Sequence, residues 1–137
     1  MNPIDIIAIH EVLAKAVSGL DQRNVALMEP CFTSDARFEL EIKGAGEIPP
    51  FVGREAIMKL MTDSMNSHSE DRRHVISNIY FESAEEDSAK VVSNLVAFQS
   101  EHGKINVMTS GVYRDLVKKI DGKWQIAVRH LALDVPF

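Results

Sequence analysis

The sequence predicts an α+β fold in which three N-terminal helices pack on a curved antiparallel sheet and enclose a pocket. Apolar residues recur at helical spacing in the first half of the chain, whereas four long runs with strand character follow from Arg72 onward. Helices followed by strands are typical of an α+β fold with the helices on one face of the sheet. A length of 137 residues fits a single domain, residues 1–137.

The first segment carries the signals of a helix start. Asn2 is a preferred N-cap residue, Pro3 suits the first helical position, and Asp5 suits the positive end of the helix dipole. The polar run DQRN predicts that this helix ends near Asp21. Apolar residues recur every three to four positions between these ends, at Ile6, Ile9, Leu13, Ala16 and Leu20.

Two further helices and a strand are predicted before the sheet. A short helix runs from a cap at Asn24 to about Pro30. The run ARFELEI alternates apolar and polar residues, which predicts a half-buried strand. KGAGEIPP is predicted to be a loop or lid because its Gly and Pro residues stand at turn spacing. Gly53 opens the third helix, whose apolar stripe holds Ile57, Leu60, Met61 and Met65.

The second half of the chain predicts four strands joined by short polar turns. The pair Asp121-Gly122 is the strongest hairpin signal among these turns. Helices on one long curved sheet leave a conical cavity between the layers, and a mostly apolar concave pocket is the usual ligand site. The expected partner is therefore a small apolar ligand. The four strands are predicted over Arg73–Ser83, Ala89–Gln99, Lys104–Val117 and Lys123–Val135.

Composition argues against several classes of function. The net charge of −5, with scattered Lys and Arg, argues against nucleic acid as a partner. No apolar run approaches the roughly 20 residues of a membrane span, and the N-terminus lacks the basic region of a signal peptide. The chain has no Cys-x-x-Cys, no helical His pair, no G-x-G-x-x-G and no P-loop, so neither a metal nor a cofactor is predicted. The single Cys31 is expected to be a buried hydrophobe in a cytoplasmic protein.

His74 lies near the start of the predicted strand in RRHVISNIYF. Strand alternation places it on one face with Ile76, Asn78 and Tyr80. One interpretation is a solvated histidine beside Asp71. The other is an imidazole that faces the cavity and acts as a general base near neutral pH. Three other histidines are expected at the surface: His10, His68 and His102.

Several short motifs follow one another along the chain: LD-x-x-N at the first helix end, F-T-x-D-A-x-F, G-x-E-A-I, His-x-x-x-Asn, G-x-Y-x-D and I-D-G-x-W-x-I-x-x-R. Each is weak alone. In this order and spacing they resemble the SnoaL-like branch of the NTF2-like, cystatin-like superfamily over about residues 5–134. Within it, LD, RRHVISN and KKIDGKW resemble scytalone dehydratase, a cofactor-free lyase. HVISN, VVSNLV and GVYRDLV are similar to the β subunit of aromatic-ring-hydroxylating dioxygenases.

The resemblance to the dehydratase implies a cofactor-free lyase or isomerase that acts on a small apolar oxygenated compound. His74 is then the catalytic base, Asp21 orients and charge-balances its ring, and Tyr113 donates a hydrogen bond to a substrate oxygen. Arg129 can bind substrate, or it can pair with Asp115 or Asp134. The predicted substrate-binding residues are Asn78, Gln99, Arg129 and Met61.

The sequence also departs from the family pattern, and the departures leave two alternatives open. Ala16 stands where many SnoaL-like enzymes carry Tyr, and Gln99 stands where the dehydratase has a second His. Gln cannot move a proton at neutral pH. One alternative is therefore a structural β-type subunit of a dioxygenase, and the other is a ligand-binding protein without chemistry. The family also implies a homodimer formed through the outer sheet face.

Overall fold

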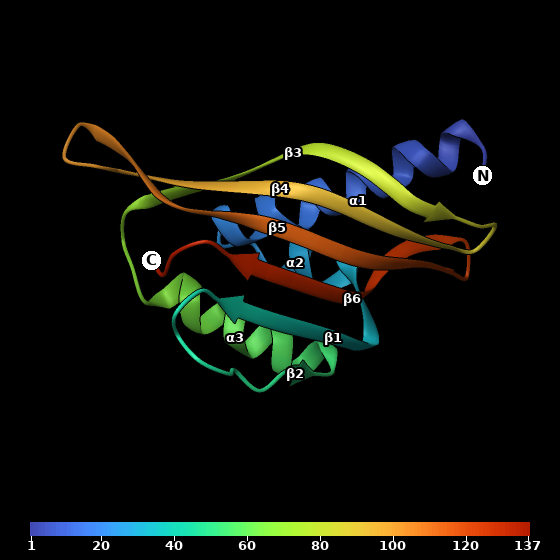
Figure 1. Ribbon diagram of the computed structural model, residues 1–137, viewed down its shortest axis with the longest axis horizontal. Helices are drawn as coiled ribbons and strands as arrows, with labels where there is room; N and C mark the ends of the chain where they lie inside the picture. The colour runs from blue at the N-terminus through green and yellow to red at the C-terminus, as the bar shows by residue number, and fades with distance from the viewer.

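The protein has one twisted six-stranded sheet with helices packed against it (Figure 1), seen in a computed structural model that describes residues 1–137. The strand order is β2-β1-β6-β5-β4-β3. The α+β fold class is confirmed. The elements are α1 (Pro3–Asp21), α2 (Val25–Met28), η1 (Glu29–Cys31), β1 (Phe32–Ile42), β2 (Phe51–Val52), α3 (Arg54–Asn66), β3 (Asp71–Ala84), β4 (Ser88–Glu101), β5 (Lys104–Ile120) and β6 (Lys123–Leu133).

Helix α1 begins and ends where the sequence predicts. The side chain of Asn2 caps it by accepting a hydrogen bond from the Asp5 backbone N–H at 2.9 Å, with proline in the first turn. Its buried face includes Ile9, Leu13 and Ala16, as predicted. Ile6 of the predicted stripe is instead 38% exposed, whereas its neighbour Asp5 is buried and accepts a hydrogen bond from Trp124.

Two expectations about the fold are wrong. The third helix, α3, begins directly after Gly53, as predicted, but β1 and β2 precede it, so the three helices are not grouped at the N-terminus. The sheet is mixed rather than antiparallel, because β1 runs parallel to its neighbour β6. Alternation within ARFELEI predicts a strand but carries no information about the direction of its partner. The long connection from β1 to the final strand allows the parallel pairing.

The last four strands form the predicted antiparallel meander. β3 pairs with β4, β4 with β5 and β5 with β6, so β3 is an edge strand. The predicted hairpin turn between β5 and β6 has positive φ at both central residues, 51° at Asp121 and 77° at Gly122. This is the geometry that favours an Asp-Gly pair. Strand β5 extends three residues beyond its predicted end, to Ile120.

A bulge changes which side chains of β3 face the helices. The pairing with β4 shifts between Ser77 and Tyr80, and Asn78 has φ of +54°. A bulge inserts an extra residue and reverses the alternation beyond it. As a result Ile79 and Phe81 pack on the core, whereas Asn78 and Tyr80 are exposed. The expectation that Asn78 and Tyr80 share the face of His74 is therefore wrong.

The core fills the space between the helices and the concave face of the sheet. Its fully buried side chains come from α1, α3 and the long strands, and they include Ile9, Leu13, Phe32, Ile57, Leu95, Val117 and Ile126. Cys31 is buried beside them, as predicted, and burial raises the pKa of its thiol. None of the helices combines the length and the apolar character that crossing a membrane requires.

Candidate active site

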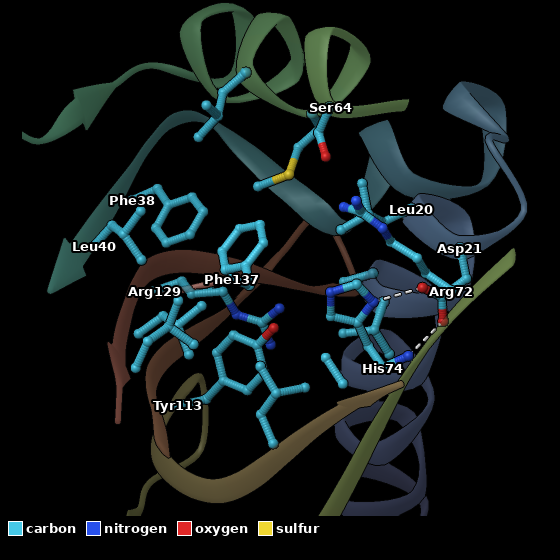
Figure 2. A pocket seen from close by; sticks show the side chains of 18 of the residues that line it. Leu20, Asp21, Phe38, Leu40, Ser64, Arg72, His74, Tyr113, Arg129 and Phe137 are labelled. Carbon is cyan, nitrogen blue, oxygen red and sulfur yellow. Dashed lines mark hydrogen bonds and ion pairs between the residues drawn. The ribbon is translucent and has the colours of Figure 1, made fainter. Parts of the chain in front are cut away.

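A cavity of about 150 Å³ opens between the helices and the concave sheet face (Figure 2). Of its 23 lining residues, 16 are hydrophobic, so an occupant must bury mainly apolar surface. The seven other residues come from α1, α3, the segment that joins α3 to β3, and the long strands: Asp21, Ser64, His68, Arg72, His74, Thr109 and Arg129. Tyr113, which counts among the 16, adds a hydroxyl group. The cavity is therefore an apolar chamber with a small number of placed hydrogen-bonding groups.

Asp21 holds His74 by two hydrogen bonds. Its Oδ1 lies 2.5 Å from Nδ1 of the imidazole, and its Oδ2 accepts the His74 backbone N–H at 2.8 Å. The His74 side chain is 17% exposed and that of Asp21 is 8% exposed. Since a carboxylate accepts hydrogen bonds, Nδ1 carries the proton, and in the neutral imidazole Nε2 is the free nitrogen. Figure 2 shows that the second ring nitrogen of His74 is directed away from Asp21, toward the cavity.

The edge position of β3 explains why this contact forms. Only one side of an edge strand is paired, so alternate backbone N–H groups point away from the sheet. The N–H of His74 is such a group, and Asp21 at the end of α1 accepts from it. A helix C-terminus is electrostatically unfavourable for a carboxylate, and the two donors of His74 offset that cost.

Tyr113 and Arg129 form a second polar group in the cavity wall. The guanidinium carbon of Arg129 lies 4.0 Å from the centre of the Tyr113 ring. Arg129 also donates two hydrogen bonds to Asp115, at 2.8 and 3.0 Å. Of the partners predicted for Arg129, Asp115 is therefore the one it contacts. Burial works to lower the pKa of Arg129, but the Asp115 carboxylate outweighs it and the pKa is raised.

Tyr113 remains protonated well above neutral pH. Burial raises the pKa of its phenol to about 12, although the charge of Arg129 works in the opposite direction. The side chain is 4% exposed, and its hydroxyl makes no hydrogen bond within the protein. The phenol is therefore a neutral donor with no partner of its own.

The predicted substrate-binding residues do not all reach the cavity. Met61 and Arg129 line it, whereas Asn78 and Gln99 do not. Asn78 lies at the bulge of β3 and is exposed. Gln99 lies two positions beyond Ala97, past the shift in pairing between β4 and β5 that follows Ala97. Gln99 lies too far along β4 to reach the cavity, whereas Leu95 and Ala97 line it. Alternation predicts the face on which a side chain lies but not how far along the strand the cavity extends.

Two ionisable cavity residues, His68 and Arg72, were not predicted. The expectation that His68 is an ordinary surface residue is wrong, because it is half-buried and lines the cavity. Burial lowers its pKa, and the positive charge of Arg72 adds to this effect. Arg72 also lines the cavity. Arg72 and His74 are two residues apart on one strand, so alternation puts both side chains on the same face. The sequence therefore contained a signal for Arg72.

No group of three or more His, Cys, Asp or Glu side chains is close enough together to hold a metal ion. The groups that the cavity offers include an imidazole fixed by a carboxylate, a second imidazole at His68, a neutral phenol and two guanidinium groups. An arrangement of this kind can take up a proton at His74 and donate hydrogen bonds to an oxygen.

The fold and this cavity define an α+β protein of the cystatin-like class. The family model for the SnoaL-like domain matches residues 4–130, and the chain belongs to that family. Among curated proteins, none matches the sequence.

Solved structures share the fold over nearly the whole chain. A protein of unknown function with a cystatin-like fold from Nostoc punctiforme PCC 73102 has a TM-score of 0.83 and 24% identity, covering 98% of this chain and 94% of that one. A putative scytalone dehydratase from Novosphingobium aromaticivorans DSM 12444 has a TM-score of 0.78 and 22% identity, covering 95% and 84%.

The β subunit of a putative aromatic-ring-hydroxylating dioxygenase from the same organism has a TM-score of 0.77 and 17% identity, covering 96% of this chain and 90% of that one. These similarities confirm the resemblance predicted from the motifs. At such sequence identities they establish the fold only, and the chemistry must be inferred from the residues of the site.

Proposed function

We propose that this protein is a cofactor-free lyase or isomerase, of the dehydratase or ketosteroid-isomerase type, acting on a small apolar oxygenated compound. The observation that carries the proposal is the double contact of Asp21 with His74 at an apolar cavity. One carboxylate fixes both the ring and the backbone of the same histidine. This contact orients the base before any substrate arrives.

In the proposed reaction, Nε2 of His74 removes a proton from a carbon next to a carbonyl group. Asp21 balances the charge of the imidazolium that forms. Tyr113 donates its hydroxyl proton as a hydrogen bond to the developing enolate oxygen. An isomerase returns the proton to another carbon, whereas a dehydratase uses it to expel a neighbouring hydroxyl group as water.

A generic proton-transfer probe tests the base without knowledge of the natural substrate. In 5-nitrobenzisoxazole, removal of one C–H proton breaks the ring N–O bond and releases a coloured cyanophenolate. We expect the protein to catalyse this elimination, and His74→Gln to lower kcat/KM by roughly 10²–10⁴-fold, the usual contribution of a general base. Asp21→Asn is expected to lower it too, because the neutral amide cannot balance the imidazolium.

The control variant is His10→Gln, which alters an exposed histidine of α1 outside the cavity. It should leave the rate unchanged. Equal rates for His74→Gln and the unaltered protein would contradict the proposal.

The ligand-binding alternative has its own support in the apolar lining of the cavity. A protein that binds apolar ring compounds but does not accelerate the elimination would fit it. The dioxygenase-subunit alternative rests on a shared fold at 17% identity. Co-purification with a larger iron–sulfur protein would favour that alternative over the enzyme.

A further inference from the structure

The cavity contains two arginines in contrasting electrostatic settings. Arg129 is paired with Asp115 through two hydrogen bonds of 2.8 and 3.0 Å, and both side chains are almost fully buried. Its positive charge is already matched. Arg72 has a single contact with Glu70, from Nη2 to Oε1 at 3.4 Å. Charge-assisted pairs of Arg and carboxylate are normally 2.7–2.9 Å long and often bidentate.

The hydrogen-bonding groups around Arg72 are not all used. Its buried Nε has no partner, and neither does Oε2 of Glu70 or Nδ1 of His68. Leaving a buried donor or acceptor without a partner is costly, so three such atoms around Arg72 require a reason. The Arg72 side chain itself is only 17% exposed.

This corner is held in place by the rest of the fold. Arg23, two residues after the end of α1, donates to the backbone carbonyl groups of Met65, His68 and Glu70 at 2.9–3.1 Å. These bonds fix the segment that joins α3 to β3. The uncommitted groups of Arg72 therefore belong to a rigid part of the molecule, which is what a binding group requires.

Arg72 lies next to the base and away from the phenol. Arg72 and His74 are two residues apart on β3, and both line the cavity. In Figure 2, Arg72 extends from β3 past the Asp21–His74 pair, and Tyr113 lies on the other side of the cavity. A ring compound between them meets a donor at each end and apolar walls elsewhere.

We propose that Arg72 is a specificity-determining residue that binds a carboxylate carried by the apolar ring substrate. The planar guanidinium matches a carboxylate in two-point geometry, and His68, kept neutral by its lowered pKa, adds a hydrogen bond. That the bound compound is a substrate rests on the proposed function. The binding itself does not depend on turnover.

Two acids face this corner, Glu70 and Asp21. Asp21 is engaged by both donors of His74. Glu70 is the competitor for Arg72, and it holds that residue by one long contact only. A ligand carboxylate that makes two short contacts can replace it. The preference of the cavity for a carboxylate should therefore increase when Glu70 loses its charge.

A matched pair of probes, 2-naphthoate and 2-naphthamide, tests this inference by equilibrium binding. The two compounds have the same shape, and only the first is charged. We expect the unaltered protein to favour naphthoate, and Arg72→Met to lower the ratio of the two affinities by roughly 10–100-fold, the value of a charged hydrogen bond. Arg73→Met is the control, because Arg73 is exposed on the opposite face of β3.

Glu70→Gln provides a second test that leaves Arg72 intact, and it should raise the ratio several-fold. An unchanged ratio in Arg72→Met, an unchanged or lower ratio in Glu70→Gln, or no binding of naphthoate to the unaltered protein would each overturn the inference. A failure of the base proposal appears instead in the elimination kinetics of His74→Gln, with the two affinities unaffected. The two proposals can thus fail separately.

Discussion

At the scale of single residues, Asp21 determines how His74 is presented to the cavity. It accepts one hydrogen bond from the ring and one from the backbone of the same residue, so rotation of the imidazole costs a charged hydrogen bond. Asp21 and His74 are 53 positions apart in the sequence. They were predicted to pair because the motifs around them resemble those of a known family. The sequence did not predict His68, because the place of that residue depends on how Arg23 holds the segment before β3. Arg72 was missed although strand alternation puts it on the same face as His74.

The phenol of Tyr113 leads to a prediction about alkaline pH. Its pKa is about 12 in the folded protein and about 10 in the unfolded chain. Above pH 10 the unfolded chain loses this proton first, so the free energy of unfolding falls as pH rises toward 12. The slope is at most about 1.4 kcal/mol per pH unit. In urea unfolding between about pH 9 and 11, Tyr113→Phe should lose this part of the slope.

Tyr80→Phe is the matched control, because Tyr80 is 53% exposed and lies outside the cavity. Its unfolding free energy should follow that of the unaltered protein at every pH. The same alkaline slope in Tyr113→Phe and the unaltered protein would contradict the buried, proton-retaining state of this phenol.

At the scale of elements, β3 explains both the success and the failure of strand alternation. Before the bulge, alternation correctly puts Arg72 and His74 on the face that lines the cavity. After it, the pattern reverses, and Asn78 turns outward. Asn tolerates the left-handed conformation better than most residues. An Asn in the middle of a strand was therefore a signal for the bulge, which alternation alone does not include.

The end of α1 yields a second prediction about an element. A Cβ added to Gly19 would lie 2.7 Å from Cβ of Met28 and 2.9 Å from its backbone nitrogen. Helix propensity alone would make Gly19→Ala stabilising by about 1 kcal/mol. We expect the contact with α2 to decide the sign, and the variant to be destabilised by about 1–3 kcal/mol in urea unfolding.

Ala14→Gly, at an exposed position of the same helix, measures the effect of helix propensity without any contact to Met28. It should be destabilised by about 1 kcal/mol. A stabilised Gly19→Ala would show that α1 and α2 do not approach as closely as the structure has them.

At the scale of the whole molecule, periodicity was sufficient to predict an α+β fold, four consecutive C-terminal strands and a cavity between the layers. It was insufficient for the direction of β1, because parallel pairing with β6 is decided by contacts between distant parts of the chain. The homodimer through the outer sheet face and the cytoplasmic location stay predictions. Sedimentation analysis would check the first of these.

Proton abstraction by His74 depends on one tautomer of its imidazole. Two-dimensional ¹H–¹⁵N NMR of the imidazole nitrogens, with the His74 signals assigned from His74→Gln, measures it directly at neutral pH. We predict that Nδ1 carries the proton, that this proton is shared with Asp21, and that Nε2 is bare. A His74 signal with the proton on Nε2 would contradict the account, because the nitrogen that faces the cavity would then have no lone pair with which to accept a proton.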